Sequence, residues 1–198
     1  MNQVDLRMPL APMTAIGTVW VAWIITWIAA SVWSAKPVVR QSRVERWRHS
    51  LLILTGAALL FSRSRGFSPL HASLFSVPPV LTWTAVALAI IGFAWTWWAR
   101  IYLGRLWSGD VTLKPEHRIV QTGPYRLTRH PIYTGLTLML FATAVVEHSS
   151  AGLLGFGLTI AGLLVKIQQE ERLLTSHFGA AYDAYRQSVP ALIPTSGL

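Results

Sequence analysis

A short polar motif near the middle of the chain carries residue types that could bind an anion. The segment 123–135 reads GPYRLTRHPIYTG, and an apolar run begins at Ile132. His130 and Pro131 are typical of an N-cap and a first helical residue, because proline lacks the amide hydrogen that would be unpaired there. The amides of the next residues carry the partial positive charge of a helix start, which favours a carboxylate or phosphate. The motif therefore predicts an anion-binding site at a helix start, with His130 at its rim.

The arginines of this motif have a second interpretation. Arg126 and Arg129 could equally anchor a membrane helix at the lipid headgroups. That interpretation explains neither the Gly-Pro turn at Gly123 nor the His-Pro-x-Tyr pattern that begins at His130. Both interpretations of the arginines stay open at the level of the sequence.

The composition is that of an integral membrane protein. Of the 198 residues, 53% are hydrophobic and only 13% are charged, which excludes an ordinary soluble domain. The absence of cysteine excludes a disulfide, a thiolate nucleophile and a cysteine-ligated metal. No histidine belongs to an i, i+4 pair or a His-Glu-x-x-His pattern, so no metal site is predicted. The net charge of +9 is interpreted as membrane topology, and no nucleic-acid partner is expected.

Five apolar stretches predict an all-α, polytopic membrane protein. Residues 1–99 are expected to hold spans at about 15–33, 48–61 and 77–98, and residues 100–198 a polar segment followed by a helix hairpin at 131–168. A ~30 Å hydrocarbon layer takes about 20 residues, so whether 48–61 crosses fully stays open. The tail predicts a short interfacial amphipathic helix. Trp20, Trp23 and Trp27, at helical spacing, could be packing residues or interface anchors.

Positive charge predicts the orientation of these spans. With the N-terminus outside, 14 of the 17 lysines and arginines fall in residues 36–48, in residues 100–129 and from Lys166 onward. Cytoplasmic loops carry the excess of Lys and Arg in membrane proteins. We therefore expect the N-terminus outside, and both the C-terminus and the active site in the cytoplasm.

Two carboxylates are predicted to face the anion site. The helices of the hairpin are joined by only four residues, 147–150, so they must lie antiparallel, with their cytoplasmic ends close together. Glu170 and Glu171 follow the second helix and would then lie beside His130. A ligand that carries both a carboxylate and an ammonium suits this arrangement, with its carboxylate at Arg129 and the amides of residues 131–134, and its ammonium at a glutamate.

These residues together resemble the isoprenylcysteine carboxyl methyltransferase and phospholipid N-methyltransferase family of membrane enzymes. The resemblance covers roughly residues 100–194, and the first spans show none. It is carried by these matches: Ser108–Val111, His117 with Ile119-Val120, the motif 123–135, Glu170-Glu171 with Leu174, Phe178-Gly179, Tyr182, Tyr185, Val189-Pro190 and Ile193-Pro194.

The resemblance implies that residues 100–198 are the methyltransferase-like catalytic region of an S-adenosylmethionine-dependent enzyme, with a cytoplasmic cofactor pocket capped by the C-terminal helix. Such an enzyme methylates a lipid-like or prenylated acceptor at the cytoplasmic surface of the bilayer. A carboxylate acceptor needs no base, whereas an amine or hydroxyl acceptor needs one, for which His130 or His117 is the candidate. The predicted catalytic residues are His130, Tyr133, Glu170 and Arg129. The predicted cofactor-binding residues are His117, Gly123, Tyr125, His130, Pro131, Tyr133, Gly135, Glu170 and Glu171.

Two other functions were weighed against methyl transfer. Membrane sterol reductases, which use NADPH, have a similar histidine-tyrosine motif and a Val-Pro ending, but in them His-x-Asn-Tyr is expected where this chain has His-Pro-x-Tyr at 130–133. The doubled glutamate at 170–171 also favours a methyltransferase. A non-catalytic membrane subunit is the third possibility. The N-terminal spans carry no motif, so the acceptor could be a prenylcysteine carboxylate, an aminophospholipid or another hydrophobic molecule.

Overall fold

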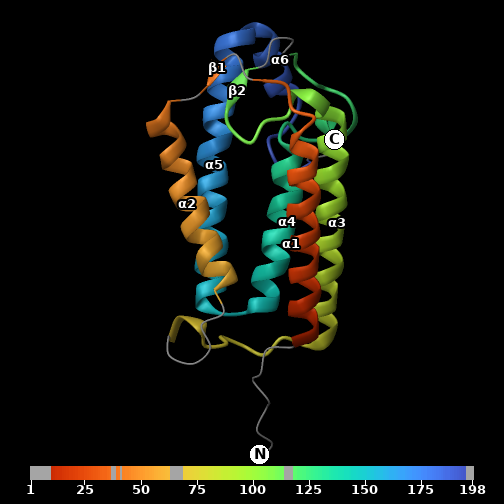
Figure 1. Cartoon of the computed structure of the whole chain (residues 1–198), viewed down its shortest axis with the longest axis vertical. Coiled ribbons are helices and arrows are strands. Elements are labelled where there is room, and N and C mark those ends of the chain that lie inside the picture. Colours follow the sequence, from red (N-terminus) through yellow and green to blue (C-terminus); the bar gives the residue numbers. More distant parts are fainter. Residues whose placement is uncertain (1–9, 37–38, 41, 63–68, 114–117, 195–198) are drawn as a thin grey trace, which may run out of the picture.

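The computed structural model describes residues 10–36, 39–40, 42–62, 69–113 and 118–194, and within them the chain is a helical bundle (Figure 1). Two-residue strands β1 (Val39–Arg40) and β2 (Thr112–Leu113) pair antiparallel at one end of it. Three 3₁₀ turns lie between the helices: η1 (Pro69–His71), η2 (Gly104–Leu106) and η3 (Gly123–Arg126). The helices are α1 (Leu10–Ser31), α2 (Arg43–Phe61), α3 (Pro79–Leu103), α4 (Pro131–Glu147), α5 (Ser150–Phe178) and α6 (Ala180–Ser188). The predicted all-α class is confirmed.

Three of the described helices are long and apolar enough to cross a membrane, over Ala11–Ser31, Pro79–Leu106 and Ser150–Phe178. Helix α4 is apolar but has only 17 residues, and α2 begins with polar residues before its apolar part. The protein is therefore a membrane protein, with five long helices at the five predicted spans.

Helix α5 continues beyond the predicted end of the hairpin at residue 168. It ends at Phe178, because no glycine or proline lies between residue 168 and Gly179, whose φ of +54° suits glycine. Glu170 and Glu171 therefore lie inside the helix rather than after it. They precede its last residue by eight and seven residues, about two turns, so their backbone is held in regular helical geometry.

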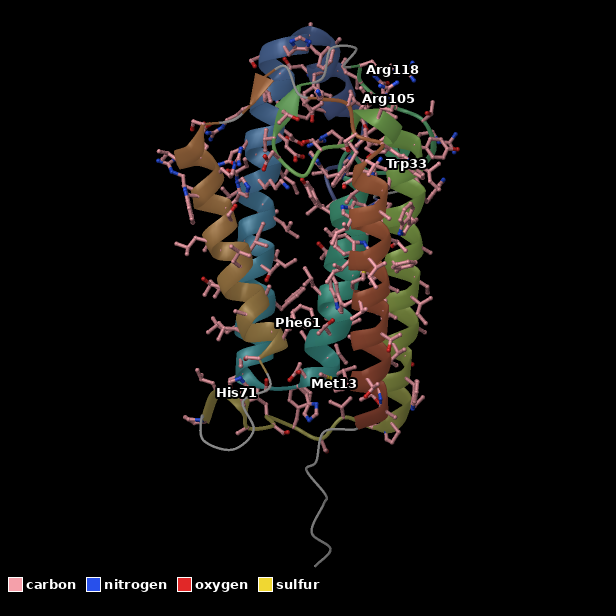
Figure 2. The ribbon with its side chains drawn as sticks, in the orientation of Figure 1. Met13, Trp33, Phe61, His71, Arg105 and Arg118 are labelled. Atoms are coloured by element: carbon pink, nitrogen blue, oxygen red, sulfur yellow. The ribbon has the colours of Figure 1, made fainter. Side chains whose placement is uncertain are left out.

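Consecutive long helices run in opposite directions, and this gathers the polar segments at one end of the bundle. Figure 1 shows β1, β2 and α6 together at this end, with the start of α1 at the other. Figure 2 shows Trp33, Arg105 and Arg118 at the same polar end, whereas Met13 and His71 lie toward the opposite end. The predicted meeting of the 123–135 motif with Glu170 and Glu171 at one end is confirmed.

The bundle is built from two close helix pairs, α2 with α5 and α3 with α4, and α1 packs on α3 and α4. Glycines allow the closest approach. A Cβ on Gly135 would lie 2.7 Å from the Gly92 carbonyl oxygen and 3.0 Å from the Thr96 amide nitrogen of α3. Small residues of this kind let membrane helices approach backbone to backbone. Gly135, predicted to bind the cofactor, thus holds α4 against α3.

We expect Gly135→Ala to destabilise the protein by ~1–3 kcal/mol, the usual cost of overpacking. The added methyl group must push α4 away from the α3 backbone, and with it the helix start that carries His130. The matched control is Gly157→Ala, because a Cβ on Gly157 meets nothing within 4 Å. Thermal unfolding of the two variants in detergent checks this prediction. Equal stability of Gly135→Ala and wild type would contradict it.

Candidate active site

A cavity of about 260 Å³ lies at the polar end of the bundle, among α1, α4, α5 and the segment 103–112. This volume is close to the lower end of the ~300–1,000 Å³ found for small-molecule pockets. Its apolar wall includes Trp23, Trp27, Trp107 and Leu136. Its polar wall is made by Asp110, Tyr125, Arg129, His130, Tyr133, Lys166 and Glu170. The cavity thus joins an ionic wall to an aromatic one.

His130 connects both glutamates. Its Nε2 lies 3.0 Å from Oε1 of Glu171, and its Nδ1 lies 3.5 Å from Oε2 of Glu170. The ring is buried and stacks on Tyr133, with 5.7 Å between centroids and 19° between planes. His130 does occupy the N-cap position of α4, but its side chain makes no capping hydrogen bond. The predicted N-cap position of His130, with Pro131 as the first helical residue, is therefore confirmed, while the ring itself is bound by the glutamates of α5.

The protonation state of His130 follows from these contacts. Burial by itself would lower the pKa of the imidazole, but the hydrogen bonds and negative charges of Glu170 and Glu171 outweigh it and raise the pKa above 6.5. The two carboxylates therefore favour the protonated form of the ring.

This raised pKa predicts how stability depends on pH. A group whose pKa is higher in the folded than in the unfolded protein contributes stability that is fully present below the unfolded value of 6.5 and is lost as pH rises through the folded value. As pH rises from 6.5 through the folded pKa of His130, we expect the unfolding temperature of the wild type to fall. In His130→Gln it should fall much less. The control is His177→Gln, since His177 is exposed on the same end of the molecule. Parallel profiles for wild type and His130→Gln would contradict the prediction.

Tyr133 completes the surroundings of Glu170. Its hydroxyl donates to Oε1 of Glu170 at 2.5 Å. Lys166, one turn before Glu170 on α5, lies with Nζ 5.5 Å from the centre of the Tyr133 ring and donates to the Gly109 carbonyl at 2.6 Å. The Glu170 carboxylate is therefore oriented by neighbouring donors and stands at the cavity wall, between a cation and a phenol.

Arg129 holds the C-terminal segment at the same place. Its Nε and Nη2 donate to Oε1 of Glu171 at 2.9 and 2.7 Å. Its Nη1 donates to the carbonyls of Arg186, at 2.9 Å, and Val189. The side chains of Arg129 and Glu171 are 10% and 15% exposed, so this is a nearly buried ion pair that joins α4, α5 and the end of α6.

The backbone around Arg129 is also bound by the C-terminal segment. The amide of Arg129 donates to the Pro190 carbonyl at 2.9 Å, and the amide of His130 donates to the Ala191 carbonyl at 3.0 Å. The Thr134 hydroxyl donates to the Leu192 carbonyl at 2.7 Å. Residues 189–192 therefore lie across the start of α4, where the sequence predicts an anion, and Glu171 already occupies the Arg129 guanidinium.

Of the other predicted cofactor residues, Tyr125 lines the cavity. Burial, with a smaller contribution from the charge of Glu170, raises the pKa of its phenol well above the usual value, so it stays neutral. Its carbonyl accepts a hydrogen bond of 2.6 Å from the hydroxyl of Tyr185 in α6. The remaining ones, Gly123, Pro131, Gly135 and Glu171, are not among the residues that line the cavity. His117 lies outside the described residues.

The backbone conformation at residue 123 explains why this residue is glycine. Its φ is +59°, and a Cβ there would lie 2.4 Å from a ring carbon of Tyr102. Glycine avoids both the strain of this φ and the clash. The Gly-Pro-Tyr turn thereby places Tyr125 at the cavity, so Gly123 acts on the site through the position of its neighbour.

Several cavity residues were missed by sequence reasoning. Trp107, Asp110 and Lys166 line the cavity but belong to no motif that was assigned a role in the site. Lys166 had a usable signal, since it stands alone in an apolar run and precedes Glu170 by four residues, which places both on one helix face. Asp110 forms an ion pair with Arg46 at 3.1 Å, a contact between segments that no local pattern indicates.

Part of the chain is similar to proteins of known family. Residues 85–176 match the isoprenylcysteine carboxyl methyltransferase (ICMT) family. The chain is 44% identical over 71 residues to methanethiol S-methyltransferase 2 of Bradyrhizobium diazoefficiens, a match that covers 35% of this chain and 26% of that protein. It is 25% identical over 167 residues to protein-S-isoprenylcysteine O-methyltransferase B of Arabidopsis thaliana, covering 74% and 81%. It is 32% identical over 99 residues to protein-S-isoprenylcysteine O-methyltransferase of Schizosaccharomyces pombe, covering 48% and 42%.

The chain thus spans about a quarter of the first of these relatives, less than half of the yeast one and most of the plant one. The family match includes most of α3, all of α4 and nearly all of α5. It therefore contains Arg129, His130, Tyr133, Glu170 and Glu171, the residues that the structure brings together at the polar end of the bundle. Residues 85–176, a little under half of the chain, are thus similar to the isoprenylcysteine carboxyl methyltransferase family.

Proposed function

We propose that this protein is an integral membrane methyltransferase that uses S-adenosylmethionine to methylate an acceptor with an ionised sulfur or oxygen and an apolar body. The observation that carries the proposal is the cavity itself, whose ionic wall contains Glu170, His130 and Lys166 and whose opposite wall is built from tryptophans. The relatives are named for methyl transfer to methanethiol or to isoprenylcysteine. Both names describe an acceptor of this class.

The charged groups of the cavity suit the amino-acid part of S-adenosylmethionine. Glu170 would hold the ammonium, and Lys166, on the same wall, would hold the carboxylate. When bound, the cofactor would supply a methyl group on a sulfonium, whose sulfur would keep the electron pair of the carbon–sulfur bond as the methyl group passes to the acceptor. The protein then has to orient the acceptor and exclude water, for which the tryptophan wall is suited.

The contacts of His130 favour one chemical class of methyl acceptor over the others. Both ring nitrogens of His130 face carboxylates, Nδ1 that of Glu170 and Nε2 that of Glu171, so neither nitrogen is placed to take a proton from an acceptor. A carboxylate or thiolate acceptor needs no base, whereas an amine or hydroxyl does. We therefore assign His130 the role of orienting Glu170, and we favour an acceptor that is already ionised. An aminophospholipid is correspondingly disfavoured.

We also propose that the polar end of the bundle lies in the cytoplasm, with the N-terminus outside. The support is the 14 of 17 basic residues in segments assigned to this end. Reporter fusions after residue 198 and within residues 110–120 should both report the cytoplasm. Reports from opposite sides of the membrane would contradict this topology.

Ligand titration tests the function directly. Purified protein should bind S-adenosylmethionine and S-adenosylhomocysteine saturably and should not bind NADPH. It should then transfer a labelled methyl group to a thiol or to an S-alkylcysteine carboxylate. Saturable binding of NADPH alone would favour a reductase, and binding of none of the three would favour a non-catalytic subunit.

A further inference from the structure

A second cavity lies farther along α1, away from the polar end. Its volume is about 420 Å³, and it is lined by Met13, Gly17 and Val21 of α1, together with Phe61 of α2 and Thr143 of α4, among others. Figure 2 shows Met13 and Phe61 in the half of the bundle opposite the polar end. The first cavity meets α1 at Trp23 and Trp27 instead. The two cavities therefore follow one another along the same helix.

Trp20 stands between them. Its ring packs edge-on against Trp23, with 5.8 Å between centroids, and against Phe61, with 5.4 Å between centroids. Its Nε1 donates to the hydroxyl of Thr143 at 3.0 Å. Trp23 lines the first cavity, whereas Phe61 and Thr143 line the second. The indole is thus fixed by contacts to both sides and cannot turn away without losing all of them.

A packed hydrophobic layer surrounds this tryptophan. Leu60 of α2 and Leu140 of α4 are 0% and 4% exposed, and Trp20 and Tyr133 pack against the cluster that they form. Tyr133 is also a wall of the first cavity. The end of the first cavity that faces the bundle centre is therefore closed by side chains from α1, α2 and α4.

We propose that Trp20, held by Phe61 and Thr143, is the floor of the acceptor site and restricts the enzyme to acceptors with a short apolar group. The inference rests on the proposed methyl transfer. A cavity of about 260 Å³ has to admit the acceptor beside the ionic wall, and an apolar chain that extends from it along the bundle has to pass the position of the indole to reach the second cavity. The acceptor class is then a small alkyl thiolate or carboxylate.

The test compares Trp20→Ala and Phe61→Ala with wild type over a series of alkanethiols from methanethiol to dodecanethiol. For wild type, kcat/KM for methyl transfer should fall steeply as the chain lengthens. Trp20→Ala should raise the ratio of long-chain to short-chain kcat/KM by at least ~10-fold, and Phe61→Ala should raise it in the same direction. The control is Trp83→Ala, because Trp83 is half exposed on α3. Wild type that methylates long and short thiols equally, or an unchanged ratio in Trp20→Ala, would overturn the proposal.

A labelling experiment tests, without turnover, whether Trp20 separates the two cavities; this separation is called the partition below. Alkyl diazirine probes of two chain lengths are photolysed with the protein, and the labelled peptides are mapped by mass spectrometry. In wild type, a probe that labels Trp23 or Leu136 should not label Ile16 or Thr143, which are buried residues of the second cavity. In Trp20→Ala the longer probe should label them. Wild-type labelling of both cavities by a single bound probe, or no new labelling in the variant, would overturn the partition.

The kinetic series and the labelling experiment test the partition and the proposed methyl transfer separately. Absence of methyl transfer together with the expected change in labelling would refute the proposed function and leave the partition standing. Methyl transfer by Trp20→Ala with the same dependence of kcat/KM on chain length as wild type would refute the partition and leave the proposed function standing. Should Trp20→Ala fail to fold, as judged by size-exclusion chromatography, Phe61→Ala carries the test, because Phe61 is 42% exposed and its truncation opens the same floor.

Discussion

Glu170→Gln should weaken the binding of S-adenosylmethionine by at least ~10-fold, whereas Glu171→Gln should weaken it less. Glu170 lines the cavity and accepts from Tyr133 there, so its charge is available to a ligand ammonium. A hydrogen bond to a charged group is worth ~1.5–3 kcal/mol, and ~1.4 kcal/mol corresponds to a factor of ten in affinity. Glu171 instead binds Arg129 and His130 behind the cavity. Isothermal titration of both variants with the cofactor checks the difference.

The sequence alone predicts that the two glutamates act together, and only their separate substitution distinguishes their roles. Both variants should be expressed and should retain their helical content, which circular dichroism in detergent controls. Unchanged affinity in Glu170→Gln would remove its role in ammonium binding. A larger loss in Glu171→Gln than in Glu170→Gln would show that the charge at the cavity wall is not the one that the cofactor uses.

Arg129→Met should release the C-terminal segment from the start of α4. The guanidinium binds Glu171 and two carbonyls at the end of α6, and its loss leaves Glu171 nearly buried beside a single partner, His130. Removal of one member of a buried ion pair costs ~3–5 kcal/mol, and we expect about 3 kcal/mol here because the pair is slightly exposed. Faster hydrogen exchange at residues 182–192 and earlier proteolysis of the tail measure the release.

Arg126→Met is the matched control, since Arg126 precedes Arg129 by three residues and is exposed. If the arginines of the motif only anchored the helix at lipid headgroups, both substitutions would have similar small effects. If Arg129 joins α4 to the tail as the structure indicates, only its own substitution should loosen residues 182–192. A protected tail in Arg129→Met would therefore favour the headgroup interpretation.

The bundle was predictable because each long helix has a local signal. Apolar runs of the right length indicate a helix that buries its backbone hydrogen bonds in lipid, and the short link at 147–150 requires an antiparallel pair. The helix ends were less predictable: α5 runs to Phe178, because polar residues continue a helix as readily as apolar ones until a residue such as Gly179 ends it. The change from apolar to polar at residue 168 marks a change of solvent and not the end of the helix.

The sequence predicted which residues form the candidate site but only part of the contacts between them. The chain's own residues determine that His130, Tyr133, Glu170 and Glu171 meet, because a tight hairpin brings its two polar ends together. Which carboxylate faces the cavity, and which binds Arg129, depends on the rotation of α5 about its axis. That rotation is set by packing against α2 and α4, which no local pattern encodes.

The amino-acid sequence by itself determined the class of the protein, the place of its helices and the end at which its chemistry lies, since these follow from hydrophobicity, helix periodicity and loop length. Only the tertiary structure decided that residues 189–192 cover the predicted anion site, that Gly135 serves the contact with α3, and that Trp20 separates two cavities. Each of these contacts joins residues that lie more than 35 positions apart in the chain. Such contacts depend on how whole helices pack against one another, so their energies cannot be read from any short stretch of the chain.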